Sequence, residues 1–133
     1  SNTELFFQHL PNDLRGKVIG ITGTKGKSTT TKLLAETLRN NKKRVVEAGN
    51  YGVALLGTYD SLIKGELDYV IAELSSYQLE HLHTSPGCAI FLNIYPDHLD
   101  RHGTPSRYLK AKSNIKAASI TPIKIRAQFW IFL

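Results

Sequence analysis

The sequence predicts an α/β protein in which a mostly parallel sheet is flanked by helices. Short, β-branched apolar runs alternate with helical stretches, and glycine-rich or polar turns follow the apolar runs. The chain has 133 residues, of which 41% are hydrophobic and 21% are charged. This length suits one domain or one piece of a larger protein, and this composition excludes a disordered chain.

The first strand is predicted at residues 17–22 (KVIGIT), because the run is apolar, rich in β-branched residues and ends next to a glycine. A glycine-rich turn at residues 23–27 follows, and a helix is predicted at residues 28–40. Three leucines near i, i+4 spacing are expected to form the apolar face of this helix: Leu33, Leu34 and Leu38.

The same alternation continues to about residue 115. Further strands are predicted at residues 44–48, 69–74 and 88–94. Between and after them we expect a weaker helix at residues 53–64, a short helix or turn at residues 77–82, and a helix at residues 105–115 with proline in its first turn.

Polar segments follow each of the four predicted strands. They read GTKGKST, GNYG, ELSSYQ and NIYPDHLDRHG, in chain order. Parallel sheets bind ligands at the carboxyl ends of their strands. The sequence therefore predicts that these four loops meet at one site on one rim of the sheet.

The first of these segments has the features of a phosphate-binding loop. Glycines allow backbone N–H groups to face phosphates, and the helix N-terminus adds positive potential. Lys27 would reach the phosphates and the Ser28 hydroxyl would ligate Mg²⁺. The strict spacing G-x-x-x-x-G-K-[ST] is not met, because Ile21 stands at the first glycine position; the alternative is a glycine-rich turn with a solvated lysine. The candidate residues are Gly23, Thr24, Lys25, Gly26, Lys27, Ser28 and Thr29.

Candidate metal ligands lie in the third and fourth polar segments. Glu73 ends an apolar strand, where a buried carboxylate is costly unless a cation pairs with it; the alternative is a solvent-facing glutamate. Asp97, His98 and Asp100 follow the fourth strand, and carboxylates and imidazole are ligands for Mg²⁺ or Mn²⁺ and for transition metals. Three further histidines are interpreted as surface residues: His81, His83 and His102.

Taken in this order, the four segments closely resemble the central, P-loop NTPase-like ATP-binding domain of the Mur ligases of peptidoglycan synthesis. The resemblance covers about residues 3–115, and ELSSYQLE is similar to the members that add D-glutamate. It implies an ATP- and Mg²⁺-dependent ligase that joins D-glutamate to UDP-N-acetylmuramoyl-L-alanine through an acyl phosphate. Folylpolyglutamate synthases share the phosphate loop but differ around the glutamate.

The resemblance also implies residue roles. Lys27 would stabilise the transferring phosphate, Ser28 and Glu73 would hold one Mg²⁺, and His98 would help hold a second. Many family members use a carbamylated lysine for the second ion, which Lys112 matches; the neighbouring Lys110 is the competing candidate, and in this chain we expect Lys112 to be uncarbamylated. The implied catalytic residues are thus Lys27, His98 and Lys112, and the positions that match contacts to the muramoyl substrate are Asn50, Ser75 and Gln78.

Three segments are expected along the chain. Residues 1–16 would be the end of an N-terminal domain or a linker, residues 17–115 a partial ATP-binding central domain, and residues 116–133 an atypical, non-native tail. The family's enzymes have flanking domains that bind the uridine nucleotide and close over ATP. We therefore expect the isolated chain to lack ligase activity.

Other classes of protein are less well supported. Seven basic residues and no acidic one follow Asp100, which would suit nucleic acid, but no nucleic-acid motif accompanies them and a solvated tail is favoured. No run is long enough to span a membrane, and the single Cys88 excludes an internal disulfide framework. The sequence indicates a cytoplasmic protein with ATP as ligand and without nucleic-acid or membrane partners. A non-catalytic nucleotide-binding fragment, or another ligase of the same superfamily, remains the alternative.

Overall fold

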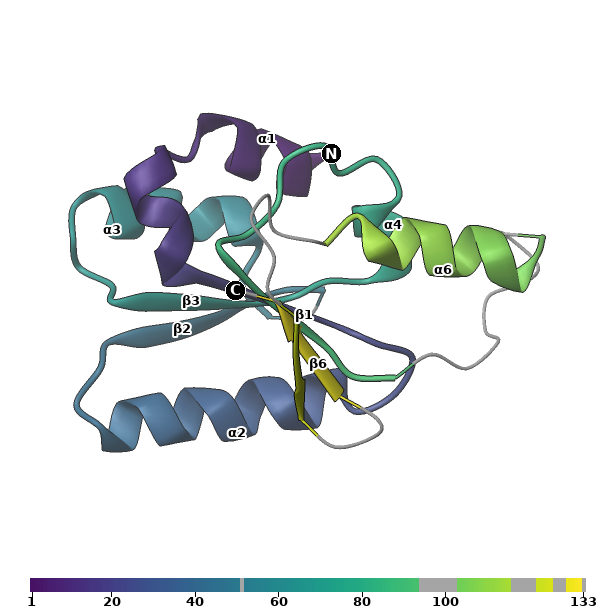
Figure 1. Cartoon of the computed structure of the whole chain (residues 1–133). Helices are drawn as coiled ribbons and strands as arrows, with labels where there is room; N and C mark the ends of the chain where they lie inside the picture. Colours follow the sequence, from purple (N-terminus) through teal and green to yellow (C-terminus); the bar gives the residue numbers. More distant parts are fainter. Residues whose placement is uncertain (51, 94–102, 116–121, 126–128, 133) are drawn as a thin grey trace.

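A computed structural model places a sheet between two layers of helices (Figure 1). It describes residues 1–50, 52–93, 103–115, 122–125 and 129–132. Within these residues the sheet has six strands in the order β2-β3-β1-β4-β6-β5. Their bounds are β1 Val18–Thr22, β2 Val45–Gly49, β3 Tyr69–Glu73, β4 Cys88–Phe91, β5 Pro122–Ile125 and β6 Phe129–Phe132.

The first four strands are parallel, which confirms the predicted fold class. β1 pairs with β3 on one side and with β4 on the other, and β2 pairs with β3. β6 runs antiparallel to β4, and β5 antiparallel to β6. β5 and β6 lie in residues 116–133; that this segment is non-native stays a prediction. Because β1 is flanked by parallel strands, the loop after it lies in the middle of the rim.

Helices lie on both faces of the sheet. Figure 1 shows α2 alone on one face and α1, α3 and α4 on the other. The helical bounds are α1 Asn2–His9, α2 Lys27–Asn40, α3 Tyr59–Ile63, α4 Ser76–Leu79 and α6 Pro105–Ser113, with 3-10 turns η1 Asn12–Lys17 and η2 Leu55–Thr58. The helix predicted at residues 53–64 is thus a 3-10 turn that continues into one short α-helix. In the described part of the chain, no helix combines the length and apolarity needed to cross a membrane.

The N-terminal residues share the main hydrophobic core. Phe6 and Phe7 are fully buried and stack edge-to-face with ring centroids 5.2 Å apart, and Phe6 also contacts Tyr59. The same cluster contains Val18 of β1 and Val70 of β3. Residues 1–16 therefore pack on the sheet as η1 and α1, although the sequence predicted only the end of a domain or a linker there.

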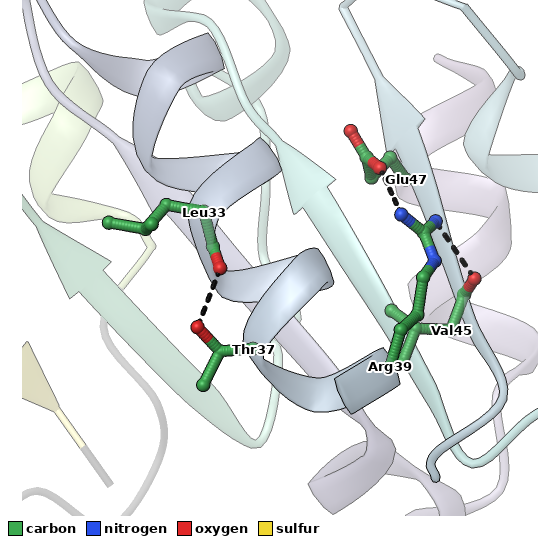
Figure 2. A network of polar contacts seen from close by, with 5 residues as sticks. All are labelled: Leu33, Thr37, Arg39, Val45 and Glu47. Atoms are coloured by element: carbon green, nitrogen blue, oxygen red, sulfur yellow. Dashed lines mark hydrogen bonds and ion pairs between the residues drawn. The ribbon is translucent and has the colours of Figure 1, made fainter. Parts of the chain in front are cut away.

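The apolar face of α2 differs from the predicted one. Thr31 and Ala35 are buried, whereas Leu33 is 64% exposed. Leu34 and Leu38 pack against a second core cluster, which consists of Ile21, Ala35, Ile71 and Leu92. The spacing of 3.6 residues per turn puts residues 31, 34, 35 and 38 on one side of the helix. Leu33, two positions after Thr31, points away from β2 (Figure 2). Including it in the apolar face was wrong.

The C-terminal end of α2 is tied to the edge strand of the sheet. Arg39 donates hydrogen bonds to the Glu47 carboxylate (2.9 Å) and to the Val45 carbonyl (3.1 Å), as Figure 2 shows. An edge strand presents unpaired backbone groups that other chains can pair with. Arg39 occupies one of these carbonyls and holds α2 against β2.

We expect Asp68→Asn to lower stability at neutral pH but not in strong acid. The Arg44 guanidinium donates to Asp68 at 2.9 and 3.2 Å, and the Arg44 backbone N–H donates at 2.7 Å. These hydrogen bonds hold the pKa of Asp68 below its ordinary value of 3.8. A lowered folded-state pKa stabilises the fold above the unfolded pKa, and this contribution is lost as the pH falls through the folded pKa.

Melting temperatures at pH 7, 5 and 3 test this expectation. The difference between the parent and Asp68→Asn should stay constant from pH 7 to 5 and shrink below about pH 4. Because Arg44 is exposed and Asp68 is partly exposed, solvent screens the pair and the difference at pH 7 should be small. A difference that grows on acidification would contradict the ion pair as its cause.

Candidate active site

A cavity of about 530 Å³ opens at the carboxyl ends of the parallel strands. The predicted segments after β1, β2 and β3 meet there, together with α6. His98 and the rest of residues 94–102 lie outside the described residues, so its proposed role stays a prediction. The cavity is lined by Thr24, Gly26, Lys27, Ser28, Thr29, Asn50, Glu73, Ser75, Ser76, Tyr77, Tyr108 and Lys112.

The loop after β1 presents the N-terminus of α2 to this cavity. Gly26 has φ +86°, a left-handed conformation that glycine adopts at little cost. It is the N-cap of α2, and no side chain of the described residues caps the helix there. Because the first N–H groups of a helix lack partners within it, they attract anions. The start of α2 is therefore suited to phosphate.

Lys27 lies across this loop. Its Nζ donates to the carbonyl of Gly23 at 2.9 Å and to that of Thr24 at 3.2 Å. These contacts hold the ammonium group beside the helix N-terminus, and Lys27 lines the cavity. Two members of the predicted phosphate set, Gly23 and Lys25, are not among the lining residues.

Ser28 and Glu73 form a hydroxyl–carboxylate pair beside the lysine. The Ser28 hydroxyl donates to Glu73 Oε2 at 2.9 Å, and Glu73 is only 6% exposed. Among the described residues, neither lysine nor arginine forms an ion pair with this carboxylate. A buried carboxylate without a cation is costly. Mg²⁺ is bound in proteins by one or two carboxylates together with substrate phosphates, so this oxygen pair fits that ion.

The loop after β2 approaches the backbone of Glu73 closely. The Asn50 N–H donates to the Glu73 carbonyl at 3.0 Å, and Asn50 lines the cavity. A Cβ atom on Gly49 would lie 2.1 Å from the same carbonyl oxygen. Glycine at this position therefore permits the contact that brings Asn50 into the site.

The loop after β3 contributes Ser75 and not Gln78. Ser75 caps α4, and Gln78 completes a capping box by accepting hydrogen bonds from the Ser75 N–H and hydroxyl. The Gln78 amide also donates to Thr3 of α1 at 3.2 Å. Gln78 does not line the cavity. Its side chain holds the loop in place, and direct contact with a substrate stays a prediction.

Of the two candidate lysines on α6, Lys112 lies at the site. It is 2% exposed, and its Nζ lies 3.1 Å from the Gly23 carbonyl and 4.8 Å from the centre of the Tyr108 ring. Lys110 is exposed and does not line the cavity. Carbamylation and metal binding by Lys112 stay predictions.

The described part of the chain holds neither a dense cluster of metal-ligating side chains nor a cysteine suited to nucleophilic chemistry. It contains no group of three or more histidine, cysteine, aspartate or glutamate residues that could bind a metal ion without other ligands. Cys88 lies on β4, where burial raises the pKa of its thiol. Because the thiolate is the reactive form, this residue is poorly suited to nucleophilic chemistry.

Sequence reasoning assigned no role to two polar residues that contact the phosphate loop. The Tyr108 hydroxyl lies 2.9 Å from the Thr24 hydroxyl, and Asn93 bonds to the backbone of Thr24 and Lys25. Asn93 begins the fourth polar segment and lies two residues after the end of β4, so its place at the start of that segment was the available signal. Tyr108 carried none, because a tyrosine in a predicted helix is ordinarily a core residue.

Comparisons with known proteins agree with this arrangement. The family model described as "Mur ligase middle domain" matches residues 21–124. The chain is 49% identical over 98 residues to a UDP-N-acetylmuramoylalanine--D-glutamate ligase of Desulfitobacterium hafniense, covering 73% of this chain and 21% of the relative. Relatives with the same name occur in Leptospira borgpetersenii, 45% identical over 76% of this chain, and Caldanaerobacter subterraneus, 44% identical over 76%. The matched part amounts to 21–22% of the length of these relatives.

Proposed function

The chain belongs to the Mur ligase family by its middle domain, and we propose that it is the ATP-binding part of a longer enzyme that joins D-glutamate to UDP-N-acetylmuramoyl-L-alanine. The names of the relatives at 44–49% identity support the choice of substrates. The observation that carries the proposal is the grouping of Lys27, Ser28 and Glu73 at the open N-terminus of α2. Location in the cytoplasm stays a prediction.

Bound ATP with Mg²⁺ would supply a phosphoryl group that converts a substrate carboxylate into an acyl phosphate and leaves ADP; an amine could then attack the acyl carbon and release inorganic phosphate. The chain's own groups would bind and orient the reactants. The N–H groups at the start of α2 and the Lys27 ammonium would bind phosphate oxygens. Both stabilise negative charge where it accumulates during transfer.

Ser28 and Glu73 would fix the metal beside those phosphates, since both offer oxygen ligands within one hydrogen bond of each other. Asn50 and Ser75 line the cavity from the loops after β2 and β3 and would orient the acyl substrate. The uridine nucleotide and the incoming amino acid would be bound by parts of the enzyme outside the matched fifth of the relatives.

A non-catalytic nucleotide-binding role is the second candidate for the chain on its own. The observation that favours it is the share of the relatives that the chain spans, about a fifth. Binding of Mg·ATP without ligation product, measured on this chain, would favour this role. Product formation from ATP, the muramoyl nucleotide and D-glutamate would exclude it.

Lys27→Ala should weaken ATP binding by about 1.5–3 kcal/mol, because it removes a charge-assisted hydrogen bond to phosphate. Calorimetry with Mg·ATP measures this loss. Lys25→Ala is the matched control. It removes the same charge two residues earlier in the chain, and the Lys25 side chain is exposed and does not line the cavity. The melting temperature should change little in both variants.

Equal affinity in the parent and Lys27→Ala would remove the phosphate role of Lys27. Equal losses in both variants would assign the effect to net charge and contradict the specific contact.

A further inference from the structure

Asn93 joins the end of β4 to the phosphate loop through both ends of its side chain. Its Oδ1 accepts hydrogen bonds from the Thr24 N–H at 3.1 Å and the Lys25 N–H at 3.0 Å. Its Nδ2 donates to the Lys25 carbonyl at 2.9 Å. The Asn93 backbone carbonyl also accepts from the Thr24 N–H, at 3.0 Å. One residue thus engages two N–H groups and one carbonyl of the loop.

These bonds determine which N–H groups of the loop face the cavity. The N–H groups of Thr24 and Lys25 point to Asn93, two residues beyond β4, so those available to an anion begin at the N-terminus of α2. The approach is close: a Cβ on Gly23 would lie 2.9 Å from the Leu92 Cβ and 3.3 Å from the Asn93 nitrogen. Glycine at position 23 is therefore part of the same arrangement.

The bonds also determine where Lys27 lies. Its Nζ is held by the carbonyls of Gly23 and Thr24. The Thr24 carbonyl and the Lys25 N–H belong to the same peptide group, and this N–H is bonded to Asn93. A rotation of that peptide would move the Thr24 carbonyl away from the ammonium. Asn93 therefore acts on Lys27 through the backbone, without lining the cavity itself.

We propose that Asn93 is a positioning residue that holds the phosphate loop in its anion-binding conformation before the nucleotide arrives. The proposal rests on the proposed function for the identity of the anion, a nucleoside triphosphate. Holding a loop in its bound conformation raises affinity by reducing the ordering cost of binding.

The first test measures, without any ligand, how strongly Asn93 holds the phosphate loop. Amide hydrogen exchange of Thr24 and Lys25, followed by NMR on the full 133-residue chain, should accelerate about tenfold or more in Asn93→Ala, because local opening then breaks fewer bonds. Asn93→Asp keeps the acceptor oxygen and should retain most of the protection. Asn114→Ala is the matched control, since the Asn114 amide donates to the carbonyls of Leu79 and Glu80 instead of the loop.

The second test measures affinity for Mg·ATP and for inorganic triphosphate by calorimetry. Asn93→Ala should weaken both affinities by a similar factor, roughly fivefold to tenfold. A factor of this size is expected when one or two hydrogen bonds that order the loop before binding are lost. Asn114→Ala should leave both affinities unchanged even where it lowers the melting temperature.

Each outcome decides the proposal. Unchanged exchange at Thr24 and Lys25 in Asn93→Ala would contradict the claim that the Asn93 side chain holds the phosphate loop. Faster exchange with unchanged affinity, or equal loss of affinity in Asn93→Ala and Asn114→Ala, overturns the positioning role. If the parent chain binds neither ATP nor triphosphate, the nucleotide function proposed for this chain fails and the positioning role falls with it, while the exchange data still decide whether Asn93 holds the loop.

Discussion

Gly49→Ala should lower the melting temperature of the chain by more than 10 °C. The added Cβ would lie 2.1 Å from the Glu73 carbonyl oxygen and 3.0 Å from the carbon and nitrogen of the same residue. All three are backbone atoms of the neighbouring strand, so no flexible side chain can move to make room. Gly49 also has φ +121°, which alanine adopts only with strain. We expect a loss of at least about 3 kcal/mol, and each kcal/mol lowers the midpoint by about 4–8 °C in a domain of roughly 100 residues.

Gly65→Ala is the control that separates backbone strain from steric overlap. Gly65 has φ +72°, but a Cβ there would meet no atom within 4 Å. Only the left-handed conformation penalises this substitution, by roughly 1–2 kcal/mol. Thermal and urea unfolding of the two variants provide the measurement. Equal losses would show that the contact between Gly49 and Glu73 does not restrain the chain in solution.

The parallel strands were predictable because each is a short run of β-branched apolar residues between turn residues. Their observed bounds lie within three residues of the predicted ones, and three of the eight bounds coincide. Helix α1 was not predicted, because its burial of Phe6 and Phe7 depends on a sheet formed by residues distant in sequence. Leu33 was misassigned for a related reason: three leucines permit more than one apolar face, and packing against β3 and β1 selects the face of Ala35.

The candidate site divides in the same way. Lys27, Ser28 and Glu73 were predicted because each ends a strand or lies at the start of a helix, where parallel-sheet topology itself brings residues together. Side-chain contacts across the site were not predictable. No sequence pattern indicates that Asn93 bonds to Lys25, 68 residues earlier. Nor does any pattern indicate that the Gln78 side chain forms its hydrogen bonds with Ser75 and Thr3.

Glu73→Gln should abolish the dependence of ATP binding on Mg²⁺. The carboxylate is buried beside the Ser28 hydroxyl, and an amide of nearly equal shape can still accept that hydrogen bond. It lacks the negative charge that Mg²⁺ requires from a protein ligand. In the parent, chelating the metal should weaken ATP binding; in Glu73→Gln, affinity should be the same with and without Mg²⁺. Affinity for Mg·ATP should fall by roughly a hundredfold, because loss of a residue that merely supports a metal ligand already costs about tenfold to a hundredfold.

Stability should respond differently from binding, which identifies the carboxylate as a ligand and not as a structural group. A buried charge without a cation opposes folding, so the melting temperature of ligand-free Glu73→Gln should equal or exceed that of the parent. Glu47→Gln is the matched control, because Glu47 pairs with Arg39 on the exposed edge of the sheet; its affinity should keep the parent's dependence on Mg²⁺. If Glu73→Gln melts lower than the parent and still binds Mg·ATP normally, the carboxylate serves the fold, and the metal must be held by other groups. The combination of unchanged stability and lost metal dependence is expected only when Glu73 coordinates the ion.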